Sequence, residues 1–283
     1  MVTELDLDLG PGRVLHVYDT GPAQAGARTL PVLWHHGTPN LGSPPEPLFG
    51  AAARLGLRWV SYDRPGCGGS TPWPDRDVAS AATCAAVVAD TLGLDRLATA
   101  GHSGGGPHAL ACAALLPHRV VGALSIAGLA PYGAEGLDWF DGMAPSGVAS
   151  LRASLAGRAA KVEHEASAAP YDPEFTPDDL TALDTEWAWL GRVATAASAQ
   201  GPGGLIDDDL AYVAPWGFDP ARITVPVQLV HGNRDRVVPS AHSRWLADRS
   251  PTAELVVTPE DGHISVLRSA EAALARLVAR LAG

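Results

Sequence analysis

The sequence is short of cysteine and has no run of basic residues, and both shortages narrow what the protein can be. Among its 283 residues there are three cysteines, an odd number with neither a C-x-x-C pair nor metal-ligand spacing: Cys67, Cys84 and Cys112. We therefore expect free thiols and no metal site. Lysine and arginine total 20 against 31 acidic residues, a formal charge of −11. Such a chain is poorly suited to bind nucleic acid or an anionic membrane surface.

Long apolar runs are missing as well. No stretch approaches the roughly 18 uninterrupted apolar residues of a membrane helix. Residues 1–10 alternate polar and apolar side chains and lack the basic start and apolar core of a signal peptide. We therefore expect a cytoplasmic protein without a membrane partner. The sequence says nothing about its oligomeric state.

Short apolar runs alternate with helix-favouring segments through the first 130 residues. Residues 4–9 and 14–18 alternate with period two, which predicts an antiparallel hairpin at a sheet edge. Continuous apolar runs predict buried strands at 31–35, 59–62, 96–100 and 120–127. Helices are expected between them, near 47–56, near 78–92 and after residue 104. This order predicts an α/β fold with a doubly wound, mostly parallel sheet.

The pattern changes between residues 131 and 217, where no apolar strand is visible. Residues 147–165 and 177–197 have helix-favouring compositions instead. Strand patterns return at 225–231 and 254–257, with a helix between them and another at the end of the chain. We therefore predict an α/β core of residues 1–130 and 218–283 and an inserted α-helical cap of residues 131–217.

Aromatic residues are dense in this predicted cap. We expect most of them to pack its own small core and one or two to line a substrate pocket. The pocket candidates from the cap are Trp139, Phe140, Trp187 and Trp189. His36, from the first half of the chain, is a further candidate.

Residues 101–105 read G-H-S-G-G and fit the pattern G-x-S-x-G between a predicted strand and a predicted helix. This pattern is typical of a nucleophile elbow, a strained turn with a serine, here Ser103, at its apex. The positions two before and two after the serine crowd each other, so only glycine or a similarly small residue fits there. The N-terminus of the following helix favours negative charge that develops near the serine.

Together with four other motifs, the elbow gives the chain a resemblance to the α/β-hydrolases that carry an inserted helical cap. The motifs are H-G-T-P at 36–39, D-R-P-G-C-G-G-S at 63–70, H-G-N-R-D at 231–235 and G-H at 262–263. They follow the predicted strands in the family order of nucleophile, acid and histidine. The resemblance spans nearly the whole chain outside the cap, whose sequence points to no particular substrate.

The chemistry expected of these residues follows from their roles. The Ser103 hydroxyl needs a neighbouring base, and His263 is the candidate. A buried carboxylate must hold that imidazole in the right tautomer, and Asp235 is the candidate. The oxyanion needs two preorganised N–H donors. We expect them from Gly104, directly after the nucleophile, and from Thr38.

Some assignments stay open at this point. The acid can instead be Asp261 or one of the three aspartates at 207–209, although we expect that run to be a solvated face or a helix start. His36 and His102 are expected to shape the oxyanion loop and the elbow. Asp63 and Arg64 are expected to form a pair that organises their glycine- and proline-rich loop.

These residues predict a serine hydrolase that cleaves a small to medium, largely apolar carboxylic ester through an acyl-enzyme. It would act on a small molecule and need neither a metal nor an organic cofactor. An aminopeptidase of the proline iminopeptidase type is an alternative, with a cap carboxylate such as Glu186 binding the substrate amine. A carbon–carbon bond hydrolase or a lactonase would use the same triad. A binding protein of this fold without turnover is the alternative from another class.

Overall fold

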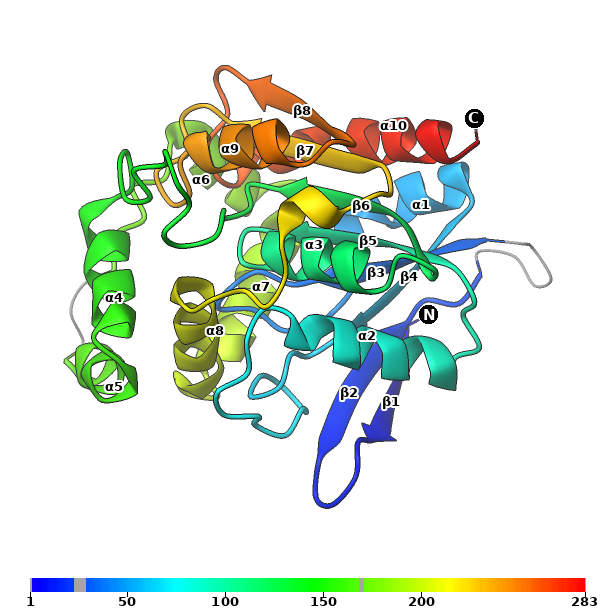
Figure 1. Ribbon diagram of the computed structural model, residues 1–283, viewed down its shortest axis with the longest axis horizontal. Helices are drawn as coiled ribbons and strands as arrows, with labels where there is room; N and C mark the ends of the chain where they lie inside the picture. The colour runs from blue at the N-terminus through cyan, green and yellow to red at the C-terminus, as the bar shows by residue number, and fades with distance from the viewer. Residues whose placement is uncertain (1, 23–28, 168–170, 283) are drawn as a thin grey trace.

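The computed structural model describes residues 2–22, 29–167 and 171–282, and an eight-stranded sheet forms its centre (Figure 1). The strand order is β1-β2-β4-β3-β5-β6-β7-β8. The strands are β1 (Thr3–Asp8), β2 (Val14–Asp19), β3 (Leu30–His35), β4 (Leu57–Tyr62), β5 (Leu97–His102), β6 (Val120–Ile126), β7 (Val227–Gly232) and β8 (Ala253–Thr258). Strand β2 pairs antiparallel with β1 and β4, and all the other pairs are parallel. The predicted mostly parallel sheet with an antiparallel edge hairpin is confirmed.

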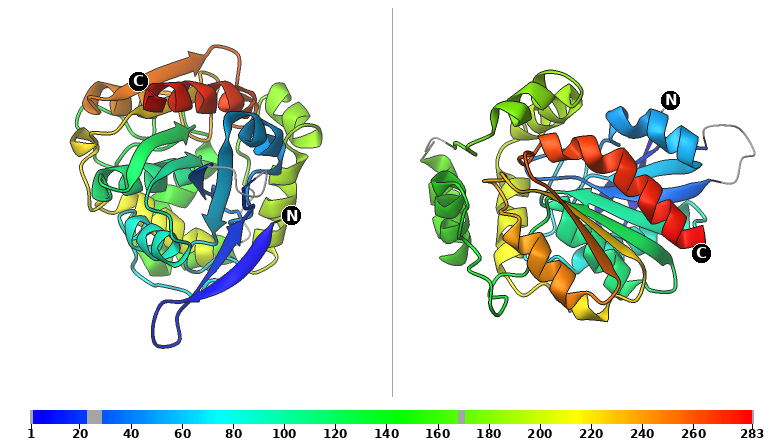
Figure 2. Two further views of the ribbon diagram at one scale, coloured as in Figure 1. Left: turned by 90° about the vertical axis from the view of Figure 1, so that its right-hand side faces the viewer. Right: turned by 90° about the horizontal axis from the view of Figure 1, so that it is seen from above.

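The side chains of β3 alternate between two apolar layers, as expected of a strand buried on both faces. Val32 and Trp34 pack into the layer that contains α1 (Phe49–Leu55) and α10 (Ala270–Ala282). Leu33 lies in the opposite layer, with side chains from α2 (Ser80–Thr91), α3 (Gly105–Leu115) and α9 (Ala241–Arg249). Helices therefore cover both faces of the sheet (Figure 2).

The insertion between β6 and β7 contains helices and, within its described residues, no strand. It comprises α4 (Pro145–Leu155), α5 (Arg158–Ala166), α6 (Pro177–Asp184), α7 (Ala188–Ser198) and α8 (Gly203–Val213). These helices gather at one end of the molecule, on the left in Figure 1 and in the right-hand view of Figure 2.

The helices of the insertion differ from the expected ones in two ways. The single helix expected over 147–165 is divided into α4 and α5 at Gly157, which has a φ of 101° that no helical residue adopts. Helix α8 was not predicted as such, because its run of three aspartates was expected to be solvated or to start a helix.

The loops that follow β3, β5, β7 and β8 lie at the same edge of the sheet, because these parallel strands run in the same direction. In doubly wound sheets, ligands bind outside this carboxyl edge. The sheet thereby brings Thr38, Ser103, Asp235 and His263 to one place from distant parts of the sequence. None of the described helices has the length and apolar character needed to cross a bilayer.

Substituting Leu274 tests the packing of α10 against the sheet. Its side chain is buried in the apolar layer where α10 contacts β6 and β7, so we expect Leu274→Ala to lower the free energy of unfolding by about 2–5 kcal/mol. Arg276→Ala, on the exposed side of the same helix, should change it by less than about 0.5 kcal/mol. Urea unfolding followed by circular dichroism measures both. Equal effects would contradict the packing described here.

Candidate active site

The turn between β5 and α3 places Ser103 in the left-handed region, with a φ of 55°. A Cβ atom at Gly101 would overlap the backbone carbonyl of Gly105, and one at Gly105 would overlap the carbonyl of His35. The Ser103 N–H donates to the carbonyl of Ile126 at 2.8 Å. This close approach of strand, turn and helix requires the glycines on either side of the serine.

Ser103, His263 and Asp235 form a continuous chain of hydrogen bonds. The Ser103 Oγ lies 2.9 Å from Nε2 of His263, and Nδ1 of the same ring lies 2.7 Å from Oδ2 of Asp235. The other carboxylate oxygen of Asp235 accepts from the backbone N–H groups of Val237 and Val238 at 2.8 and 2.9 Å. This geometry suits a hydroxyl that donates to Nε2 while the Nδ1–H donates to the carboxylate.

The Asp235 carboxyl is buried, and burial alone would raise its pKa. The neighbouring His263 and hydrogen bonds from His231 and His263 outweigh burial, and they lower the pKa of Asp235 below its usual range. The carboxylate therefore stays ionised at neutral pH. An ionised group at this position stabilises the imidazolium that forms when His263 takes a proton.

None of the other aspartates weighed as the acid contacts the His263 ring in the described part of the chain. Asp207 pairs with Arg158 at 2.6 Å, and Asp209 pairs with Lys161 at 2.6 Å. The backbone carbonyl of Asp261 accepts from the N–H of Arg234. Of the aspartates weighed as the acid, Asp235 alone lies against the His263 ring in the residues that the structure describes.

The two expected oxyanion donors, Thr38 and Gly104, lie beside Ser103 in the wall of one cavity. Within the described ranges, neither backbone N–H donates a hydrogen bond to another protein group. The Tyr212 hydroxyl, in the wall of the same cavity, joins the two residues, 2.8 Å from Thr38 Oγ1 and 3.2 Å from the carbonyl of Gly104. Both N–H groups are thus held in place and free to bind an oxyanion.

A buried carboxylate from α8, Asp208, supports the oxyanion loop. Its Oδ2 accepts from Thr38 Oγ1 at 2.5 Å and from Nη2 of Arg64 at 2.5 Å. The Oδ1 accepts from Nε of Arg64 at 3.0 Å and also from Arg76. Arg64 in turn donates to the carbonyls of His36 and Gly37. One cluster of charges therefore fixes the loop after β3.

The position of Asp208 corrects the expectation that residues 207–209 form a solvated face. Burial alone would raise the pKa of Asp208, but Arg64 and Arg76 hold it well below its usual range. The expected pair of Asp63 and Arg64 is also wrong, because Arg64 pairs with Asp208. Asp63 instead accepts from the N–H groups of Gly42 and Gly69, at 2.6 and 2.8 Å, and organises its own loop.

A second aspartate from the insertion, Asp179 of α6, supports the loop of His263. Its Oδ1 accepts from the N–H groups of Ile264 and Ser265, at 2.9 and 2.7 Å, and its Oδ2 lies 3.3 Å from the N–H of His263. Asp179 also forms a capping box with Thr176 at the start of α6. The T-x-x-D pattern of that box is visible in the sequence, but its contact with the histidine loop is not.

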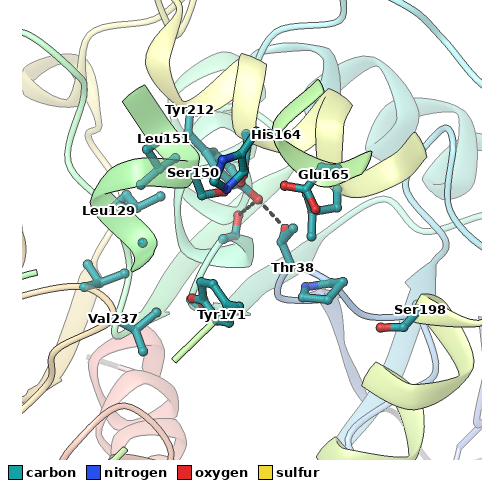
Figure 3. Close-up of a pocket in the computed structure, with 17 residues that line it drawn as sticks. Thr38, Leu129, Ser150, Leu151, His164, Glu165, Tyr171, Ser198, Tyr212 and Val237 are labelled. Atoms are coloured by element: carbon teal, nitrogen blue, oxygen red, sulfur yellow. Dashed lines mark hydrogen bonds between the residues drawn. The ribbon is translucent and has the colours of Figure 1, made fainter. Parts of the chain in front are cut away.

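Two cavities meet at Ser103. The larger, of about 330 Å³, is bounded by α4, α5 and α8 and includes Gly104, Leu151, Glu165 and Asp209 in its wall (Figure 3). The smaller, of about 200 Å³, includes His263, Phe175, Leu183, Leu190 and Ile264. A small or medium-sized ligand can therefore reach Ser103 from two directions.

The five residues expected in the pocket wall line neither of these cavities, and that prediction is wrong. Trp187 and Trp189 are buried in the apolar layer beside α10. Trp139 and Phe140 pack with other aromatic side chains, and the Trp139 Nε1–H donates to the carbonyl of Ala130 at 2.8 Å. Large aromatic side chains stabilise most by burial, and Trp139, Trp187 and Trp189 are buried while Phe140 is partly buried against Trp139.

His36 lies behind the oxyanion loop rather than in the cavity wall. Its Nδ1 is 2.8 Å from the carbonyl of Gly37, and its Nε2 accepts from the Arg64 N–H at 3.0 Å. Burial and the nearby Arg64 keep the pKa of His36 well below its ordinary value. A neutral ring that braces the loop agrees with its expected structural role.

Glu186, the expected amine ligand of an aminopeptidase, is at the surface. It pairs with Arg268 at 2.5 Å and belongs to neither cavity wall. The described residues also include no group of three or more His, Cys, Asp or Glu side chains that is arranged to hold a metal ion.

The sequence profile of the alpha/beta hydrolase fold matches residues 31–270. The chain belongs to the α/β-hydrolase fold family. The predicted family and the prediction of an α/β-hydrolase enzyme are confirmed by that match. A comparison with curated proteins finds no match.

Solved structures with similar folds include several hydrolases. A thermophilic esterase from Thermogutta terrifontis is 20% identical, with a TM-score of 0.69 over 99% of each chain. An enol-lactonase from Burkholderia xenovorans LB400 is 22% identical, with a TM-score of 0.66 over 96% of this chain and 98% of that one. A 2-hydroxy-6-oxo-6-phenylhexa-2,4-dienoate hydrolase from Rhodococcus sp. strain RHA1 is 21% identical, with a TM-score of 0.63 over 100% of this α/β-hydrolase and 99% of that one.

Neutralising Asp208 should destabilise the α/β-hydrolase strongly. Asp208→Asn leaves Arg64 and Arg76 buried without their counter-charge, so we expect the free energy of unfolding to fall by about 3–5 kcal/mol. Asp207→Asn is the matched control in the same helix, because its partner Arg158 is 41% exposed and can be solvated. Asp207→Asn should lower the free energy of unfolding clearly less than Asp208→Asn does. Urea unfolding of both variants measures the difference, and equal losses would contradict the role of Asp208.

The effect of Asp208 should also depend on pH. Its pKa is lower in the folded protein than in the unfolded chain, so its stabilising contribution is present above the unfolded value of about 3.9. The contribution is lost as the pH falls through the folded value. The stability difference between wild type and Asp208→Asn should therefore stay constant between about pH 5 and pH 8 and shrink in acid. A difference that already falls over the neutral range would contradict this.

Proposed function

We propose that this protein is a serine hydrolase that cleaves a small to medium-sized carboxylic ester through an acyl-enzyme. The observation that carries the proposal is the chain of hydrogen bonds from Ser103 through His263 to Asp235. The free N–H groups of Thr38 and Gly104 add the electrostatic support that an oxyanion requires. Two of the similar folds bear the names of an esterase and an enol-lactonase, which agrees with this chemistry.

In the proposed mechanism, Ser103 Oγ attacks the ester carbonyl carbon and passes its proton to Nε2 of His263. The oxyanion forms between the N–H groups of Thr38 and Gly104. His263 then gives the proton to the leaving alcohol oxygen as the carbon–oxygen bond breaks. A water molecule then attacks the carbonyl carbon of the acyl-enzyme and passes a proton to Nε2 of His263. His263 gives that proton to Ser103 Oγ as the acyl carbon–oxygen bond to the serine breaks, which releases the acid and restores the serine.

We further propose that residues 131–217 act as a cap over the core of residues 1–130 and 218–283. Helices α4, α5, α7 and α8 contribute to the walls of the two cavities. A wall built from this insertion would exclude water and select the substrate, while the residues that perform the chemistry stay on the core.

Labelling with a fluorophosphonate tests the nucleophile. Attack by Ser103 Oγ on phosphorus expels fluoride and leaves a stable adduct that mass spectrometry detects. We expect one adduct in the wild type, on the peptide that contains Ser103, and none in Ser103→Ala. Ser240→Ala, outside both cavities, should label as the wild type does. An adduct that survives in Ser103→Ala would overturn the proposal.

Replacing the acid tests the orientation of His263. Asp235→Asn should lower kcat/KM for 4-nitrophenyl acetate by about 10⁴-fold, because the amide favours the wrong imidazole tautomer. Asp261→Asn removes a carboxylate two residues before the histidine, but one with no contact to its ring. It should leave the rate within a few-fold of wild type. If the two variants lose equal activity, the assignment of Asp235 is wrong.

A further inference from the structure

We infer that the two cavities divide the substrate, with the acyl chain in the larger and the alcohol in the smaller. This assignment rests on the proposed serine hydrolase function and narrows its substrate class. The preferred ester would join an apolar alcohol to an acyl chain whose far end carries a hydrogen-bond donor.

The direction of proton transfer decides which cavity takes the alcohol. In the tetrahedral intermediate, the carbon carries Ser103 Oγ, the oxyanion, the alcohol oxygen and the acyl chain. The alcohol oxygen must receive its proton from Nε2 of His263, so it lies on the histidine side of the serine. The acyl chain takes the direction that remains.

The walls of the cavities match these two directions. His263 and its neighbour Ile264 belong to the smaller cavity and not to the larger. Gly104 belongs to the larger cavity and not to the smaller, while Thr38 and Ser103 belong to both. The carbonyl carbon therefore sits where the two cavities meet, with the leaving group directed into the smaller.

Much of the wall of the smaller cavity is apolar, and its polar residues besides Thr38, Ser103 and His263 are Asn40, His102 and Tyr171. Side chains from α6 and α7 and from the segment before α6 form much of its wall: Phe175, Leu183, Leu190 and Ala194. None of the four can form a side-chain hydrogen bond. An alkyl or aryl alcohol suits this surface.

One part of the wall of the larger cavity is charged. Lys161, which the sequence shows to be the single lysine of the chain, is fully buried behind it. Its ammonium group donates to Ser150 Oγ at 2.5 Å and pairs with Glu165 Oε1 and Asp209 Oδ2, both at 2.6 Å. Ser150, Glu165 and Asp209 all belong to the cavity wall, and Figure 3 shows Ser150 and Glu165 on the same side of it.

The two carboxylates in this part of the wall keep acceptor oxygens available to a ligand. In the described part of the chain, Oε2 of Glu165 and Oδ1 of Asp209 accept no hydrogen bond. The ammonium of Lys161 is engaged by Ser150, Glu165 and Asp209, so these two oxygens are left as acceptors. A hydroxyl or an amine at the end of an acyl chain complements them better than a methyl group does.

Two helical glycines allow the division to be tested with matched variants. Gly147 of α4 lines only the larger cavity, and Gly191 of α7 lines only the smaller. A Cβ at Gly191 meets no atom within 4 Å, and one at Gly147 makes only ordinary contact with Met143. Gly147→Leu and Gly191→Leu should therefore fold and each narrow one cavity. Gly203→Leu, at an exposed position that lines neither cavity, is the control.

The substrates for this test are methyl hexanoate and hexyl acetate, which carry their long chain on opposite sides of the ester bond. Gly147→Leu should lower kcat/KM for methyl hexanoate by about tenfold and spare hexyl acetate, and Gly191→Leu should do the reverse. The opposite pattern, or equal effects on both esters, would overturn the division. If circular dichroism shows that a glycine variant does not fold, another variant of the same cavity replaces it. Leu151→Ala, which widens the larger cavity, replaces Gly147→Leu. Ala194→Leu, which narrows the smaller cavity, replaces Gly191→Leu.

The donor preference is tested with 4-nitrophenyl esters of hexanoate and 6-hydroxyhexanoate. The wild type should prefer the hydroxylated chain, and Glu165→Gln should reduce that preference by about tenfold. Glu163→Gln, on the exposed side of the same helix, should keep it. No preference in the wild type would overturn the donor assignment. Activity on 4-nitrophenyl acetate that is lost in Ser103→Ala tests the proposed function separately, so the two failures are distinguishable.

Discussion

The ion pairs of Asp208 with Arg64 and Arg76 hold together the parts from which the candidate active site is built. The three side chains come from α8 and from the segment after β4, and all three are buried. A charge in such surroundings is tolerated only while its partners stay in place. Helix α8 therefore cannot leave the core without a large loss of electrostatic energy, and the loop of Thr38 is held together with it.

Asp179 does for the histidine loop what Asp208 does for the oxyanion loop. It accepts backbone hydrogen bonds from three successive residues, beginning with His263. Both aspartates belong to the helical insertion, although the residues that they support belong to the core. The insertion therefore supports the two loops that carry Thr38 and His263 as well as bounding the cavities, and a shortened version of this chain without it would lose both supports.

Most of the fold, and the meeting of Ser103, Asp235 and His263 at one edge of the sheet, were predictable, because they depend on local patterns. Apolar runs of strand length, alternating with helical segments, predicted the sheet, and the G-x-S-x-G turn predicted the position of Ser103. Because β5, β7 and β8 are parallel, the loops that follow them lie at one edge of the sheet, and this does not depend on how the insertion folds. For the same reason, Asp235 and His263 could be chosen from their place after a strand.

The supports and the cavity walls were not predictable in the same way. Charged side chains are rarely buried unless they are paired, so a run of three aspartates at 207–209 is expected at the surface. The partners of Asp208 lie 144 and 132 positions away, and no local pattern connects them. Trp187 and Trp189 are residues of a type that often lines apolar pockets. Their orientation depends on how α7 packs, and both are buried in the apolar layer beside α10.

The burial of Lys161 has a consequence for labelling the protein in solution. Its amine is enclosed by side chains of α4, α5 and α8, so an acylating reagent added to the native protein has no path to it. Modification requires these helices to separate and the ammonium to lose its proton in water. The rate at which this one lysine reacts would therefore report how often α4, α5 and α8 separate, without any probe being engineered into the chain.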